Sequence, residues 1–131
     1  MEKPTLRTPL SSVRGLGSAR EGTHHFIMQR VTAIALVPLT WWFMAELLKL
    51  VLKPDGRKFM HWFASGFHVT ALVLMLVALF WHAKLGIQTI IEDYVHCPCI
   101  KIAALLVNYF VMVVCIAVSI IAVLKLHFHA F

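Results

Sequence analysis

The sequence predicts an all-α integral membrane protein with three transmembrane helices. Of the 131 residues, 60% are hydrophobic and 14% are charged, and the mean hydropathy is +0.82. The charged residues are segregated, which leaves three long apolar runs, each close to the roughly 20 residues that a helix needs to cross a bilayer. We expect the spans at about residues 31–50, 60–88 and 101–125, within one three-helix membrane domain of residues 23–131.

Residues 1–22 have a different composition from the rest of the chain. They are polar and basic, and they contain no apolar core of the kind that a secretory signal carries. Their Arg and Ser content is faintly like that of a mitochondrial presequence, but the segment is short and carries Glu2 and Glu21. We expect a polar tail on the cytoplasmic or matrix side, which either lies along a soluble partner or is disordered.

The placement of Lys and Arg predicts the orientation, because these residues concentrate on the inner side of a membrane. With three spans, the tail and the second loop share one side, which carries seven Lys and Arg residues against five on the other. This places the N-terminus inside and the C-terminus outside. It also places Arg30 and the Asp93-Tyr94 pair on the same side of the membrane.

Short segments are expected to connect the spans. Residues 53–58 combine Pro, Gly and charge and predict a turn, and Pro98 is expected to end the helix that carries Tyr94. Amphipathic rings favour the membrane interface, and we interpret four tryptophans near the ends of apolar runs as interfacial anchors: Trp41, Trp42, Trp62 and Trp81.

One stripe of the second span carries the residues with the most chemistry. Each helical residue advances by about 100°, so His82, Gly86, Thr89 and Asp93 share a narrow face. An imidazole at membrane depth is costly and usually serves an ion, a proton or a metal cofactor. His82 could instead hydrogen-bond a neighbouring carbonyl, but the gap at Gly86 and the acidic end of the stripe favour the wall of a redox cofactor site.

A b-type haem needs an axial ligand on each face of its iron. His68 precedes His82 by 14 residues, so helix geometry separates the two by about 20 Å. If His82 binds haem, the opposite ligand therefore comes from another polypeptide. We interpret His68 as a packing or interfacial histidine, and a second haem is the alternative.

Polar residues near the inner ends of the first two spans suggest further contacts. Two imidazoles, His24 and His25, accompany Arg30 there, and Arg30 suits haem propionates because Arg binds carboxylates through a planar fork of donors. The alternative for Arg30 is a side chain that extends to the interface. Tyr94 and Asp93 could serve a quinone, whose reduction takes two electrons and two protons, although a tyrosine there is ordinarily a membrane anchor.

The segment His96-Cys97-Pro98-Cys99 holds three soft ligands but no second pair that would complete a tetrahedral metal site. We interpret its cysteines as structural. Cys115, in the third apolar run, is interpreted as a small apolar residue.

Two blocks, GTHHFIMQRVTAIAL at residues 22–36 and HAKLGIQTIIEDYVH at 82–96, resemble a known family. They are similar to the smaller hydrophobic membrane anchor subunit of succinate dehydrogenase (respiratory complex II). The spacing from Phe63-Ala64-Ser65 to His82 fits as well, and the likeness covers residues 22 to about 125.

This resemblance implies site residues and partners. It implies that His82 is an axial ligand of haem b with Gly86 packed against the haem. It further implies that Tyr94 and Asp93 contact ubiquinone and that His24 and Arg30 lie near the haem propionates and the quinone pocket. The implied partners are a companion membrane anchor subunit, the iron–sulfur subunit, the flavoprotein subunit and membrane lipid; no nucleic acid is expected.

The resemblance implies a chain that performs no succinate chemistry by itself. It would dock the flavoprotein and iron–sulfur subunits, share haem b, and help form the ubiquinone-reduction site in the tricarboxylic acid cycle and aerobic electron transport. We expect a multi-pass protein of a bacterial inner membrane rather than of the mitochondrial inner membrane. The alternatives are the anchor of a related fumarate reductase and a cofactor-free membrane scaffold in which His82 only packs.

Overall fold

The computed structural model describes residue 10 and residues 20–130, so most of the predicted tail at residues 1–22 lies outside the described residues. From residue 20 onward, the regular structure of the described residues is entirely helical: α2 (Arg20–Leu52), α3 (Gly56–Ala64), α4 (Gly66–Tyr94) and α5 (Pro98–Ala130). The helices α2, α4 and α5 are each long and apolar enough to cross a membrane. The prediction of an all-α protein with three spanning helices is confirmed.

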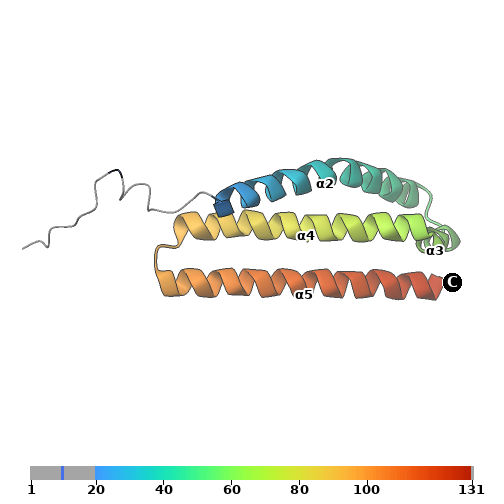
Figure 1. Ribbon diagram of the computed structural model, residues 1–131. Helices are drawn as coiled ribbons and strands as arrows, with labels where there is room; N and C mark the ends of the chain where they lie inside the picture. The colour runs from blue at the N-terminus through green and yellow to red at the C-terminus, as the bar shows by residue number, and fades with distance from the viewer. Residues whose placement is uncertain (1–9, 11–19, 131) are drawn as a thin grey trace, which may run out of the picture.

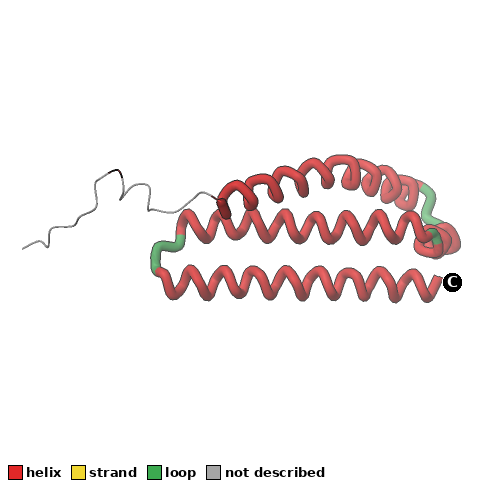
Figure 2. Tube along the Cα trace, viewed as in Figure 1, coloured by secondary structure: helices red, strands yellow, loops and turns green. Residues whose placement is uncertain are grey.

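The three long helices lie side by side, with α4 between α2 and α5 (Figure 1). The start of α2, the last turns of α4 and the start of α5 lie at one end of this bundle, which we call the site end (Figure 1). The helix α3 and the last turns of α5 lie at the opposite end, the far end (Figure 2). Arg30 and the Asp93-Tyr94 pair therefore belong to the same half of the bundle, as the three-span topology requires.

The path of α2 is bowed rather than straight (Figure 1). Pro38 lies inside this helix. Proline has no N–H to donate and its ring clashes with the carbonyl one turn earlier, so it bends a helix at that point. The two halves of α2 consequently point in different directions, and the first half carries the residues that face the last turns of α4.

The connection between the first two spans differs from the prediction. Residues 56–64 form a separate helix, α3, that lies across the far end of the bundle (Figure 2). Asp55 caps it, since its Oδ1 accepts a hydrogen bond from the backbone N–H of Arg57 at 3.0 Å. Ser65 has an extended backbone, with φ −74° and ψ 114°, and this interrupts the helix between α3 and α4. The second span therefore begins at Gly66 rather than near residue 60 and continues to Tyr94.

The connection between α4 and α5 also differs from the prediction in the place of Pro98. The helix α4 ends at Tyr94, and Val95 follows with a non-helical backbone of φ −95° and ψ 105°. Pro98 is the first residue of α5 rather than the residue that ends α4. Proline suits this position, because its fixed φ is helical and the N–H that it lacks would have no helical partner there.

The buried core lies toward the far end and is built from aromatic and aliphatic side chains: Trp62, Phe63, Val69, Leu72, Met75 and Val123. His68 is stacked between Trp62, with ring centroids 4.9 Å apart, and Trp42, with centroids 5.9 Å apart. The imidazole of His68 thus packs between two indole rings. Trp62 is buried, so its interpretation as an interfacial anchor is wrong, whereas Trp41 is exposed.

Candidate functional site

His82 lies on α4 with its imidazole turned toward α2. Its Nδ1 atom lies 3.0 Å from the hydroxyl oxygen of Thr32, a buried residue of α2. His82 itself is half-buried. Among the described residues its other ring nitrogen, Nε2, has no hydrogen-bond partner. The imidazole is therefore held by one nitrogen across the contact between α2 and α4, and the second nitrogen is free to bind a ligand.

The sequence interpretation missed Thr32. The available signal was a polar residue inside an otherwise apolar run, one turn after Met28. A threonine in a helix commonly donates to a carbonyl of the preceding turn, so such a residue does not by itself indicate a partner on another helix. Only the packing of α2 against α4 brings Thr32 to His82.

The stripe that was predicted from His82 to Asp93 lies on the single helix α4. Gly86 comes one turn after His82, and a Cβ atom added there would meet nothing within 4 Å. The surface beside the imidazole is thus open. Thr89 donates its hydroxyl to the carbonyl of Leu85 at 3.1 Å, which uses the proton of that hydroxyl within the helix. Asp93, at the end of the stripe, is exposed.

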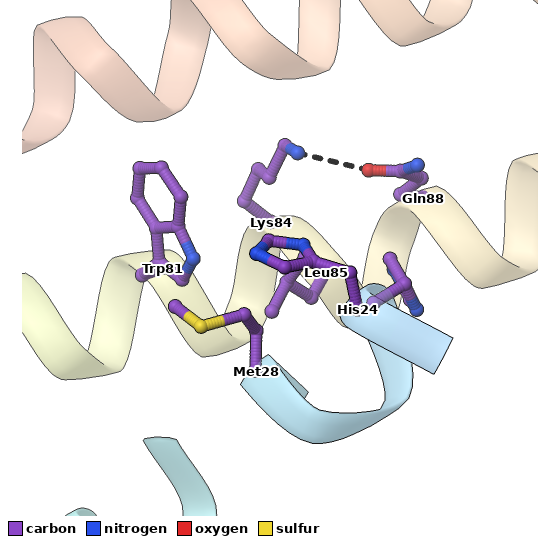
Figure 3. Close-up of a pocket in the computed structure, with 7 residues that line it drawn as sticks. His24, Met28, Trp81, Lys84, Leu85 and Gln88 are labelled. Atoms are coloured by element: carbon purple, nitrogen blue, oxygen red, sulfur yellow. Dashed lines mark hydrogen bonds between the residues drawn. The ribbon is translucent and has the colours of Figure 1, made fainter. Parts of the chain in front are cut away.

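A hollow of about 380 Å³ lies at the site end, between the start of α2 and the last turns of α4. This volume is in the range of small-ligand sites, about 300–1,000 Å³. Its lining comes from both helices: His24, His25, Met28, Trp81, Lys84, Leu85 and Gln88. Figure 3 shows the imidazole of His24 reaching from α2 over α4 toward Lys84. Of these residues only His24 was predicted as part of a site.

The hollow has a cationic wall. The ammonium group of Lys84 donates to Oε1 of Gln88 at 2.9 Å (Figure 3), and Nε2 of Gln88 donates to a carboxylate oxygen of Glu92 at 2.8 Å. The Nε2 atom of His25 is buried without a hydrogen-bond partner among the described residues. Such a wall suits a carboxylate or a carbonyl oxygen, since both accept hydrogen bonds.

Sequence reasoning treated Lys84 only as a marker of orientation. The signal for its role was the spacing of Lys84, Gln88 and Glu92, which lie one turn apart and therefore on one helix face.

The structure does not bring the remaining predicted residues together. The guanidinium carbon of Arg30 lies 4.9 Å from the centre of the Phe26 ring on the same helix, and Arg30 does not line the hollow. Tyr94 is 79% exposed and Asp93 is exposed beside it. Arg30, Asp93 and Tyr94 are thus available on the surface of this chain rather than assembled into a pocket.

The three cysteines are free thiols in the structure. Cys97 and Cys99 are exposed, and Cys115 is half-buried in α5. Across residue 10 and residues 20–130, no three His, Cys, Asp or Glu side chains gather around a point that could hold a metal ion. A haem iron needs no such cluster, because a protein supplies it with one axial side chain on each face.

Residues 4–125 match the family described as the succinate dehydrogenase/fumarate reductase transmembrane subunit. The chain belongs to this family. Its similarity to proteins named succinate dehydrogenase hydrophobic membrane anchor subunit agrees with this assignment. The protein of this name from Rickettsia bellii is 31% identical over 93 residues, which are 70% of this chain and 73% of that one.

Two further relatives carry the same name. The protein from Rickettsia conorii is 33% identical over 91 residues, which are 69% of this chain and 71% of that one. The protein from Paracoccus denitrificans is 31% identical over 87 residues, which are 66% of this chain and 67% of that one. No solved structure matches this chain. The resemblance predicted from the two sequence blocks is confirmed at the level of the family.

Proposed function

We propose that this chain is a membrane anchor subunit of a succinate:ubiquinone oxidoreductase in a bacterial inner membrane. In this role it docks the soluble subunits, shares haem b with a second membrane anchor and helps form the ubiquinone-reduction site. The family, the names of the relatives and the three membrane-spanning helices support the proposal. The family also includes fumarate reductases, but the relatives from Rickettsia and Paracoccus are named for succinate dehydrogenase.

The observation that carries the cofactor part of the proposal is the position of His82. Its imidazole is half-buried between α2 and α4, its Nε2 has no partner among the described residues, and the helix surface one turn along is open at Gly86. This arrangement fits a residue that would hold haem, and the open surface at Gly86 would leave room beside it. When bound, the haem would supply one-electron transfer within the membrane.

A second ligand for the haem iron would come from a different chain. His68 is stacked between two tryptophan rings toward the far end of the bundle. It also precedes His82 by about four turns of α4, a rise of roughly 20 Å along the helix. The two imidazoles therefore cannot hold one iron. The companion membrane anchor subunit is the expected source of the second ligand.

Tyr94 and Asp93 suit the quinone part of the site. Both lie at the end of α4, where water supplies the protons that quinone reduction consumes. The phenol of Tyr94 can donate a hydrogen bond to a quinone carbonyl, and the carboxylate of Asp93 can accept and pass a proton beside it. Because both side chains are exposed in this chain, the rest of the pocket would come from the companion anchor and the iron–sulfur subunit.

The surface of the bundle also carries groups that need partners outside this chain. Large apolar side chains are exposed along α2 and α5, and lipid can cover these. Lipid cannot satisfy Lys84 and His25, which line the hollow, or the free nitrogen of His82, which lies elsewhere on α4. A companion membrane subunit would cover these polar groups, and the flavoprotein and iron–sulfur subunits would dock at the site end.

The direct test of the anchor role is affinity purification from native membranes with a tag on this chain. We expect the flavoprotein, the iron–sulfur subunit and one further membrane protein to co-purify in equal amounts, with succinate:ubiquinone reductase activity in the eluate. A tagged chain that elutes without a flavoprotein would contradict the proposal. Faster fumarate reduction by a low-potential quinol than succinate oxidation would instead support the fumarate reductase alternative.

A further inference from the structure

The contact between Thr32 and His82 has a defined direction. The hydroxyl oxygen of Thr32 lies 2.9 Å from the carbonyl oxygen of Met28 and 3.1 Å from that of Gln29, both on α2. A hydroxyl has one proton to donate, and these two carbonyls can only accept. The proton of Thr32 is therefore directed at its own helix, and its oxygen accepts a hydrogen bond from Nδ1 of His82 at 3.0 Å.

This direction determines the tautomer of His82. A neutral imidazole carries its proton on one ring nitrogen and a lone pair on the other. With the proton on Nδ1 and bonded to Thr32, the lone pair belongs to Nε2, which has no partner among the described residues. The tautomer that Thr32 selects is therefore the one in which Nε2 can bind a metal.

The rigidity of Thr32 makes it suited to this task. Its residue is 8% exposed, and its hydroxyl contacts two carbonyls of α2 and the imidazole of His82, so packing and these contacts hold it between the two helices. A buried imidazole N–H that lost its acceptor would leave an unsatisfied polar group, which is unfavourable. The ring of His82 is thus oriented by α2, even though it is part of α4.

We propose that Thr32 is a positioning residue for the haem ligand His82. Its hydroxyl holds Nδ1–H, keeps the lone pair on Nε2 and increases the basicity of that nitrogen, as hydrogen-bond acceptors behind metal-bound histidines do. A more basic axial ligand stabilises ferric over ferrous iron and so lowers the midpoint potential of the haem. This inference rests on the proposed assignment of His82 as a haem ligand.

The test uses the intact complex and three substitutions of Thr32 whose side chains accept a hydrogen bond with decreasing strength. Thr32→Ser keeps the hydroxyl, Thr32→Cys offers a weak sulfur acceptor, and Thr32→Val keeps the branched shape without any acceptor. We expect the haem midpoint potential to rise in the order Ser, Cys, Val, with the g values of the ferric haem shifted most in Val. Haem retention in Val is expected to fall about 10-fold or more.

The order of the three variants separates a hydrogen bond from packing. Equal shifts in Thr32→Ser and Thr32→Val would show that the hydroxyl is irrelevant and would overturn the proposal. If the Val complex does not assemble, the comparison of Thr32→Cys with Thr32→Ser decides the question, since the two differ in one atom. If Thr32→Cys then has the same haem midpoint potential and the same g values as Thr32→Ser, the proposal is overturned.

The variant His82→Leu distinguishes this inference from the function on which it rests. Loss of haem in His82→Leu with unchanged potential and g values in Thr32→Val would reject the role of Thr32 and leave the ligand assignment intact. Unchanged haem in His82→Leu would reject the ligand assignment itself, whatever the Thr32 variants show.

Discussion

The side-chain amide of Asn108 on α5 donates a hydrogen bond to the backbone carbonyl of Lys84 on α4, with an Nδ2–O distance of 3.0 Å. Asn108 is 7% exposed, so this bond lies inside the bundle. Polar side chains of this kind hold membrane helices together, because lipid offers no partner for them. The bond ties α5 to the turn of α4 that carries both His82 and the cationic wall of the hollow.

Replacing Asn108 with Leu is therefore expected to destabilise the contact between α4 and α5. The loss should be about 0.6 kcal/mol, the average for interhelical hydrogen bonds in a membrane, and at most about 1.7 kcal/mol. A thermal unfolding series on the purified complex would measure it. Ser119→Ala, which removes a polar group at another position of α5, is the control. An Asn108→Leu complex as stable as the control would show that the bond contributes nothing.

Tyr94→Phe is expected to lower ubiquinone reduction while leaving assembly intact. The change removes one hydroxyl from an exposed ring, so the fold of this chain should not depend on it. A lost hydrogen bond to the quinone corresponds to about 1–3 kcal/mol. Steady-state rates with ubiquinone and with an artificial acceptor that bypasses the quinone site would separate the two effects.

Tyr109→Phe, the same change on α5, is the matched control for Tyr94→Phe and should leave both rates unchanged. A parallel loss of both activities in Tyr94→Phe would indicate a defect of assembly and would remove the support for a quinone contact.

Gly86→Leu is expected to reduce the haem content of the complex. A Cβ atom added at this position would meet nothing within 4 Å, so we expect the bundle to tolerate a side chain there. The added side chain would occupy the open surface beside His82, where haem would have room. Haem per flavin in the purified complex is the measurement. Gly66→Leu, at another open position of α4, should keep its haem, and equal haem in the two variants would rule out the packing role of Gly86.

The main architecture could be predicted from the sequence because it depends on composition. Apolar runs of spanning length specify membrane helices, and three spans require that Arg30 and Tyr94 share a side. The helical period placed His82 and Gly86 on one face without knowledge of any neighbour. The break at Ser65 was not predicted, because the apolar residues Trp62 and Phe63 of α3 continue into the run of α4 and hide the boundary.

The partners of the site residues could not be predicted in the same way. Thr32 and His82 are 50 residues apart, and Asn108 and Lys84 are 24 apart. Each pair depends on how one helix is rotated and shifted against another, and periodicity within a single helix does not specify this. The hollow at the site end was missed for the same reason, since its lining comes from both α2 and α4.

Expression of this chain without its companions should yield a degraded or haem-free product. In the single chain no companion subunit covers His25, Lys84 or the free nitrogen of His82, and lipid cannot satisfy these polar groups. Co-expression with the companion membrane subunit should restore both the protein level and the haem, as followed by immunoblot and absorbance. A monodisperse, haem-loaded preparation of the chain alone would contradict this, and His68 would then have to be reconsidered as a ligand.

The reduced-minus-oxidised visible spectrum of the purified complex with His82→Leu tests the central claim most directly. We predict that the b-type haem band is lost or shifted, since one axial nitrogen is removed from the iron. The control is His68→Phe, which keeps an aromatic ring between Trp42 and Trp62 and should retain the wild-type band. A His82→Leu complex with the wild-type band and wild-type haem content would contradict the account.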